Sequence, residues 1–308
     1  MLDREQVHGI YASLLTAFHP DGSLNEILNR ENIRKLVAVG VHGIYTTMSA
    51  GEVQSITFDE HQCLCQILAE EAGGKVVTIA GCTAPSTAEA IRRVKVAQEL
   101  GIDAVANALP YFVALRKAEC YRYFQDLAES CPAIGIFHYQ TSRASTLLDA
   151  SDYEVLARIP TFLGSKQTGN DWRLFMDLRR RTPDLAHMPV DPWLVPAMMI
   201  GARGCWSGLA VQNPPYILQM YQLASQQCWP EALARQQQYN AFAEAVLVPL
   251  TKLGYLDPVI DKATANICGF MHAGDPRQPF LPMEPEHREQ LRQAIFERHQ
   301  FMLYRRSG

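Results

Sequence analysis

The feature of this sequence that most limits its fold is an alternation of two kinds of segment. Eight short apolar runs, each bounded by glycine, proline or polar residues, are typical of buried strands, and longer amphipathic stretches separate them. The runs are Gly9–Thr16, Gly43–Met48, Val76–Gly81, Ala104–Leu109, Ala133–His138, Thr161–Lys166, Leu185–Val190 and Gly204–Leu209. Strands that are apolar throughout, each followed by a helix, indicate a parallel sheet covered on both faces.

The stretches between the runs predict helices, several of which begin with a capping residue: Ser86 or Thr87 before one, and Asn170 or Asp171 before another. They are Leu28–Val39, Phe58–Ala72, Thr87–Leu100, Ala118–Ser130, Ala150–Arg158 and Asp171–Arg181. Eight strand-helix units favour a closed (β/α)8 TIM barrel over an open doubly wound sheet. A dinucleotide-binding sheet would need a G-x-G-x-x-G turn after the first strand, and this chain has Phe-His-Pro-Asp-Gly-Ser there.

From Pro214 onward the alternation ends and only helical patterns continue. They cover Tyr216–Ala224, Pro230–Leu250, Val259–Phe270 and Glu284–Phe301. We therefore expect residues 1–213 to form the barrel and residues 214–308 to add helices packed on it. Because no linker separates the two parts, we expect a single structural unit.

Composition excludes several kinds of partner. The net charge of −4 lacks the basic excess that a nucleic acid or an anionic membrane surface would attract. No run of about 18 apolar residues is present, so no membrane span is expected. The N-terminus is polar from its third residue, which argues against a secretory signal. The eight scattered cysteines read as reduced thiols of a cytoplasmic protein.

Lys166 is the outstanding candidate for chemistry, because it alone among seven lysines closes an apolar strand. In a (β/α)8 barrel the reactive groups lie where strands end and loops begin. We expect burial at this rim to lower the pKa of the ammonium group, leaving some neutral amine. Such an amine attacks a ketone or aldehyde and forms a Schiff base. The alternative is a lysine that only reaches solvent from the strand end.

An ordered set of motifs resembles the dihydrodipicolinate synthase/N-acetylneuraminate lyase family of class I, Schiff-base-forming pyruvate aldolases. The motifs are Leu15-Thr16-Ala17-Phe18, Asp21-Gly22-Ser23, Gly40-Val41-His42-Gly43, Ser49-Ala50-Gly51-Glu52, Ile79-Ala80-Gly81, Pro110-Tyr111-Phe112, Gly164-Ser165-Lys166-Gln167-Thr168-Gly169-Asn170, Pro196-Ala197, Gly201-Ala202-Arg203-Gly204 and Arg277-Gln278-Pro279. The resemblance implies a lyase or synthase that joins Lys166 to pyruvate or a small sugar-derived 2-oxo acid. It implies no cofactor or metal, and a homotetramer built from two dimers.

The resemblance also assigns the loop after the second strand to the substrate. The family has two hydroxyl residues before Gly-Glu, and this chain has Ser49 followed by Ala50. Ser49 and the backbone N–H groups of Ala50 and Gly51 are therefore expected to hold the substrate carboxylate. The second hydroxyl is missing. The alternative role for Ser49 is a cap at the entry of the next helix.

At the end of the fifth strand the family has a tyrosine that moves protons. Three residues of this chain compete for the position: Phe137, His138 and Tyr139. Side chains alternate along a strand, so Phe137 and Tyr139 point one way and His138 the other. Phe137 cannot carry a proton, which leaves Tyr139 as the first choice, His138 as the second, and a strand without a proton carrier as the remaining alternative.

Three further positions follow from the same resemblance. Arg143 matches a substrate-binding arginine and could hold a second carboxylate, although a surface arginine is equally ordinary. Trp206 is expected to wall the pocket or to fill the barrel core. Phe112 stands where the family often has a tyrosine that reaches a neighbouring subunit, and it has no hydroxyl.

Two other functions remain open from the sequence. A metal-dependent aldolase could use Glu52, His138, His187 and Asp191, which lie near strand ends but share no recognisable ligand spacing. A catalytically weakened member of the family could bind a 2-oxo acid, or serve in an assembly, without turnover.

Overall fold

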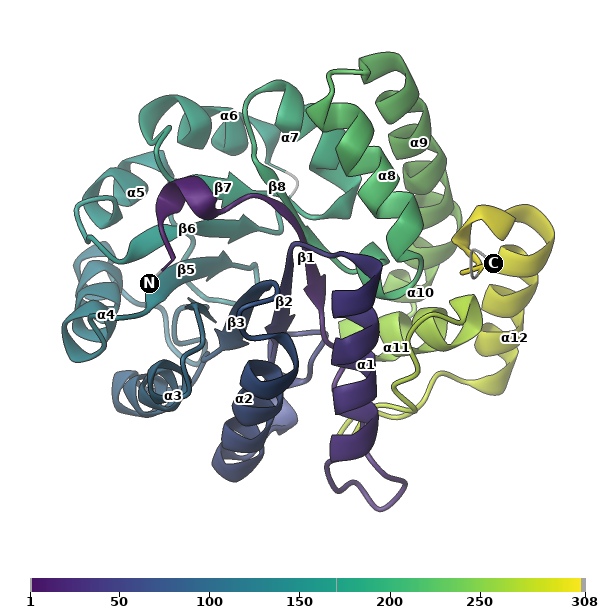
Figure 1. The fold of residues 1–308 in the computed structure, drawn as a ribbon, viewed down its shortest axis with the longest axis horizontal. Coiled ribbons are helices and arrows are strands. Elements are labelled where there is room, and N and C mark those ends of the chain that lie inside the picture. Colours follow the sequence, from purple (N-terminus) through teal and green to yellow (C-terminus); the bar gives the residue numbers. More distant parts are fainter. Residues whose placement is uncertain (1, 170, 306–308) are drawn as a thin grey trace.

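The computed structural model describes residues 2–169 and 171–305, and its centre is a parallel barrel (Figure 1). All eight predicted strands are present: β1 (Gly9–Ser13), β2 (Gly43–Thr46), β3 (Val77–Gly81), β4 (Ala104–Asn107), β5 (Gly135–Gln140), β6 (Phe162–Gln167), β7 (Ala186–Met188) and β8 (Gly204–Ser207). They pair in parallel in the order β7-β6-β5-β4-β3-β2-β1-β8. A parallel bridge between Val190 and Trp206 closes the ring. The (β/α)8 fold is confirmed.

Helices surround the strands, and the six predicted ones are confirmed. The barrel helices are α1 (Glu26–Val39), α2 (Phe58–Ala72), α3 (Thr87–Glu99), α4 (Lys117–Ser130), α5 (Ala150–Leu156), α6 (Trp172–Arg181), α7 (Leu194–Met199) and α8 (Pro214–Ser225). Ser86 and Asp171 cap α3 and α6 as expected, and Asn170 lies outside the described residues. The short α7 has no counterpart among the helices that periodicity predicts, because six residues are too few to show a helical period.

The C-terminal part adds helices on one side of the barrel (Figure 1). They are α9 (Trp229–Phe242), α10 (Val248–Lys252), α11 (Asp257–Cys268) and α12 (Pro285–Gln293). Helix α8 packs against both α7 and α1, so it completes the outer ring next to β8. A π-helical turn at Ala243–Leu247 separates α9 from α10. Helix α10 contains Pro249, which has no backbone N–H to continue the α-helical hydrogen bonds from α9. The division into residues 1–213 and 214–308 stays a proposal.

The inside of the barrel is a packed core with one polar end. Leu2 and Val7 are buried at the N-terminal end, where the Arg4 side chain donates hydrogen bonds to three carbonyls of the α5–β6 segment. Above them lie the rings of Tyr11 and Phe137. This end is therefore closed, and the opposite end, where strands run into loops, is left to carry a site.

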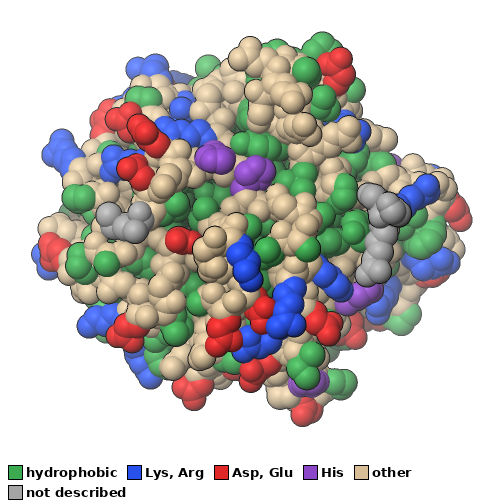
Figure 2. Space-filling model, in the orientation of Figure 1, with side chains coloured by type: hydrophobic (Ala, Val, Ile, Leu, Met, Phe, Trp, Pro, Cys, Tyr) green, Lys and Arg blue, Asp and Glu red, His purple; other side chains and the backbone are tan. Residues whose placement is uncertain are grey.

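The surface matches the near-balanced composition. Acidic and basic side chains are interspersed over the face seen in Figure 2, without a continuous basic area. Among the described residues, no helix is long and apolar enough to cross a membrane.

Candidate active site

Lys166 lies near the end of β6, with its side chain inside the barrel. The residue is only 6 % exposed, and its Nζ donates a hydrogen bond to the hydroxyl of Tyr45 on β2 at 3.3 Å. The same nitrogen lies 4.7 Å from the ring centre of Tyr45 and 4.8 Å from that of Tyr139. A cavity of about 330 Å³ opens beside it. The amine therefore faces an enclosed space at the barrel mouth and not bulk water.

The pKa of Lys166 differs from the sequence expectation. Burial lowers it, but the Tyr45 and Tyr139 oxygens and the carboxylate of Asp257 together outweigh burial, so the pKa is raised above its ordinary value. The expected lowering is therefore wrong, because the sequence does not show which groups the fold places around the amine. The lysine is an ammonium ion at neutral pH and must lose a proton before it can act as a nucleophile.

Tyr139 is brought next to Lys166 by the register of the sheet. Residue 139 on β5 pairs directly with residue 166 on β6, and the Tyr139 hydroxyl lies 2.9 Å from the Ser49 hydroxyl. Both side chains line the cavity. Two hydroxyl groups in hydrogen-bond contact at the cavity wall can pass a proton between a bound molecule and the protein.

The competing residues on β5 lie elsewhere. His138 faces the helix layer, where its Nδ1 lies 2.7 Å from the hydroxyl of Tyr153, and burial together with the charge of Lys117 lowers its pKa to about 3. Phe137 faces the interior but lies deeper, with its ring against Trp206. The alternation inferred from the sequence therefore holds, and of the three only Tyr139 lines the cavity.

The loop after β2 is held in a strained shape that places Ser49 and Ala50 at the cavity. Thr47 and Glu52 both have positive φ angles, of 47° and 59°, which residues with side chains rarely adopt. Among the described residues, the backbone N–H groups of Ala50 and Gly51 donate no hydrogen bond. The loop thus offers the Ser49 hydroxyl and two free donors to an anion, although only Ser49 and Ala50 directly line the cavity.

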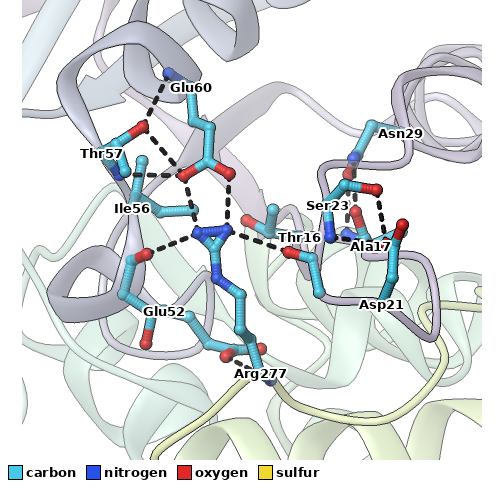
Figure 3. Close-up of polar contacts among 12 residues, drawn as sticks. Thr16, Ala17, Asp21, Ser23, Asn29, Glu52, Ile56, Thr57, Glu60 and Arg277 are labelled. Atoms are coloured by element: carbon cyan, nitrogen blue, oxygen red, sulfur yellow. Dashed lines mark hydrogen bonds and ion pairs between the residues drawn. The ribbon is translucent and has the colours of Figure 1, made fainter.

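Ionic contacts from the C-terminal part fix this loop. The buried carboxylate of Glu52 lies 2.6 Å from the buried Nζ of Lys262 on α11, and it accepts a hydrogen bond from the backbone of Arg277. The Arg277 guanidinium in turn binds both oxygens of Glu60 (Figure 3). It also donates hydrogen bonds to the carbonyls of Ser55 and Gly22. The loops after β1 and β2 are thereby tied to one arginine.

Arg143 lines the cavity but its charge is already matched. Its guanidinium binds both carboxylate oxygens of Asp257 at 2.9 and 3.0 Å. Although burial raises the pKa of Asp257, the hydrogen bonds and charge of Arg143 and the hydroxyl of Ser49 bring it below its ordinary value, so the carboxylate is ionised. A second substrate carboxylate, which Arg143 was expected to hold, would therefore have to compete with Asp257 for the guanidinium.

Trp206 takes both of the expected places at once. It packs edge to face against Tyr11, Tyr45 and Phe137, with ring centres 5.2–5.3 Å apart, and it also lines the cavity. The indole therefore contributes both to the wall of the cavity and to the aromatic cluster around Lys166.

Among the cavity residues that sequence reasoning missed, three have ionisable side chains. Tyr45 could have been found by alternation along β2, but nothing in the sequence connects Asp257 and Asp261 of α11 with the barrel mouth. The pKa of Asp261 is raised, first by burial and then by the nearby Asp257 and Asp191 carboxylates.

The four residues considered for a metal do not converge. Glu52 pairs with Lys262, and His138 contacts Tyr153. The other two are also engaged elsewhere: His187 lies between the hydroxyls of Ser165 and Thr182 in the helix layer, and Asp191 accepts hydrogen bonds from Ser207 and the Gly208 backbone. Across residues 2–169 and 171–305, no three His, Cys, Asp or Glu side chains are grouped to hold a metal ion.

The family model of the dihydrodipicolinate synthetase family matches residues 6–298. The chain belongs to this family. One relative is a 4-hydroxy-tetrahydrodipicolinate synthase of Methanopyrus kandleri. The two sequences are 27 % identical, and their alignment covers 94 % of this chain and 96 % of the relative. A 4-hydroxy-tetrahydrodipicolinate synthase of Herminiimonas arsenicoxydans is 29 % identical to this chain, and the alignment covers 94 % of this chain and 98 % of that protein. A DapA-like lyase of Halobacterium salinarum is 27 % identical, with 92 % of both covered. The family member is an enzyme, a lyase of the class I aldolase type.

Solved structures agree with this family member in fold. PhdJ bound to a substrate intermediate superposes with a TM-score of 0.89 at 21 % identity, covering 98 % of each chain. YagE of E. coli K12 in complex with pyruvate gives 0.87 at 18 % identity, covering 94 % of this chain and 98 % of the other. N-acetylneuraminate lyase of Fusobacterium nucleatum superposes with a TM-score of 0.85 at 24 % identity, covering 97 % of this chain and 99 % of the other.

Proposed function

We propose that this enzyme joins Lys166 to a small 2-oxo acid as a Schiff base, and uses that bond to make or break a neighbouring carbon-carbon or carbon-oxygen bond. The substrate is pyruvate or a sugar-derived 2-oxo acid. The observation that carries the proposal is the buried Lys166 amine beside a cavity that also holds Tyr139 and Ser49. Membership of the dihydrodipicolinate synthetase family supports it.

The chain's own residues supply each step. After Lys166 loses a proton, its amine attacks the substrate ketone and water leaves, which gives an iminium ion. The Ser49 hydroxyl and the N–H groups of Ala50 and Gly51 hold the substrate carboxylate. The iminium draws electrons from the adjacent carbon, so that carbon loses a proton or breaks its next bond. The proton moves through the Tyr139–Ser49 pair.

Two consequences of family membership belong to the same proposal. We infer a cytoplasmic enzyme and a homotetramer built from two dimers. Phe112, which is 88 % exposed, stands on the β4–α4 segment where a hydroxyl residue would reach a neighbouring subunit. Because phenylalanine carries no proton, the relay stays within one subunit.

Borohydride trapping across a panel of 2-oxo acids tests the proposal. Wild-type protein is expected to gain one reduced adduct per chain, and Lys166→Ala is expected to gain none while keeping its circular dichroism spectrum and melting temperature. Turnover that persists in Lys166→Ala would refute the Schiff base. An adduct without turnover on any acid would instead favour a family member that binds 2-oxo acids without converting them, for which the missing hydroxyl at Ala50 is the structural reason.

A further inference from the structure

A second pocket, of about 240 Å³, adjoins the cavity at Lys166. The two spaces share Ser49, Tyr139, Thr141 and Arg143, so they meet at the Tyr139 phenol, and Lys166 lines only the first. Most of its other lining residues are apolar: Val53, Ala108, Tyr111, Leu256, Pro258 and Phe280. A molecule held at Lys166 therefore has an apolar space ahead of it, in the direction away from the amine.

The second pocket offers no free positive charge. Among its lining residues in the described chain, Arg143 alone is charged, and its two terminal amino groups donate to the carboxylate of Asp257. Asp257 and Asp261 on α11 also place two carboxylates at the adjoining cavity. A second carboxylate on the substrate would have to compete with Asp257 for Arg143, which reduces what it gains in binding energy.

The size and lining of the pocket favour a ring. A cavity of roughly 150 Å³ with apolar walls is enough to take up benzene, so this pocket is large enough for an aryl group. Tyr111 and Phe280 supply aromatic surfaces, against which another ring packs well. Leu256 stands at the rim, 45 % exposed.

We propose that this pocket holds an uncharged apolar group, foremost an aryl ring, carried on C4 of the 2-oxo acid. The inference rests on the proposed function and names its substrate class. For a 4-aryl-4-hydroxy-2-oxobutanoate bound to Lys166, the C3–C4 bond breaks and its electron pair moves into the iminium, which becomes an enamine. The C4 hydroxyl proton passes through the Tyr139–Ser49 pair and returns to C3. The aryl aldehyde leaves, and water then releases pyruvate from Lys166.

The test compares two aldehydes as partners of pyruvate: benzaldehyde, which is apolar, and glyoxylate, which carries a carboxylate. Wild-type enzyme is expected to favour benzaldehyde in kcat/KM by about tenfold or more. Leu256→Asp places a charge at the rim of the pocket and is expected to reduce kcat/KM for benzaldehyde about tenfold.

A matched control is available three residues away. Leu253 is 59 % exposed and does not line the pocket, so Leu253→Asp makes the same change of charge outside it and should leave kcat/KM for benzaldehyde unchanged. A preference for glyoxylate, or equal activity of Leu256→Asp and Leu253→Asp toward benzaldehyde, would overturn the inference.

A binding measurement separates this inference from the proposed function. If pyruvate is not trapped at Lys166, the Schiff base is refuted. Titration calorimetry with trans-cinnamate then still tests whether the pocket binds an aryl group. Binding about tenfold weaker to Leu256→Asp than to Leu253→Asp supports an aryl site. Equal binding by the two variants, or no binding to wild type, refutes it.

Discussion

Tyr139 is distinguished from its neighbours on β5 by two contacts made at once. Its ring lies against the Lys166 amine, and its hydroxyl touches Ser49 at 2.9 Å. Neither contact is available to His138, which is enclosed by the helix layer. The residue that completes the pair with the lysine is therefore selected by the direction of its side chain as well as by its chemistry.

Replacing Tyr139 by phenylalanine should remove proton transfer and leave the fold intact. We expect kcat to fall by about 10²–10⁴, while trapping of pyruvate on Lys166 slows but persists. Tyr11→Phe is the control, since this phenol lies in the same barrel but does not line the cavity. Steady-state kinetics on both variants decide: equal kcat values would show that the Tyr139 hydroxyl moves no proton.

At the level of elements, the loop after β2 depends on a helix more than 200 residues away in the chain. Glu52 at the end of that loop and Lys262 on α11 form an ion pair from which solvent is almost wholly excluded. Burial lowers the pKa of Lys262, and the Glu52 carboxylate opposes that shift. The C-terminal helices thus act on the shape of the candidate carboxylate site as well as covering the barrel.

Lys262→Met should destabilise the protein because it leaves the buried carboxylate of Glu52 without its charged partner. Breaking such a pair costs about 3–5 kcal/mol of the free energy of unfolding, and we expect a lower melting temperature together with slower trapping of pyruvate. The double variant Glu52→Gln/Lys262→Met removes both charges and should regain part of the loss. A single variant as stable as wild type would show that the pair does not hold the loop.

At the scale of the whole molecule, three histidines outside the cavity are buried within residues 2–169 and 171–305, and they link stability to pH. Burial is the main cause that lowers the pKa of His138 and His187 to about 3 and that of His61 to about 4. Below pH 6.5 the unfolded chain binds protons at these side chains, whereas the folded chain does not. The unfolded state therefore holds more protons, and stability must fall as the pH is lowered through that range.

We expect the free energy of unfolding to fall by about 1.4 kcal/mol per pH unit for each of these histidines once the pH is below about 6. Melting curves between about pH 7 and pH 5 measure the effect. In His138→Phe the slope should decrease by the contribution of one proton. A melting temperature that stays constant over this range would contradict the burial of all three.

The sequence predicts the barrel well because each strand has a local signal. The apolar runs give all eight strands, and alternation correctly places Tyr139 on the face opposite His138. The surroundings of Lys166 are not local: Tyr45 comes from β2 and Asp257 from α11. The raised pKa of the lysine, and the engagement of Arg143 by Asp257, follow only from folding. For the same reason the apolar pocket beside the cavity has no signal in any single segment.

The most direct test of the account is to locate the reduced pyruvate adduct by peptide mass spectrometry. After borohydride treatment the added mass should lie on the peptide that contains Lys166, and the peptides that contain Lys117 and Lys262 should stay unmodified. An adduct on another lysine, or no adduct in a folded protein that still turns over a 2-oxo acid, would contradict the account.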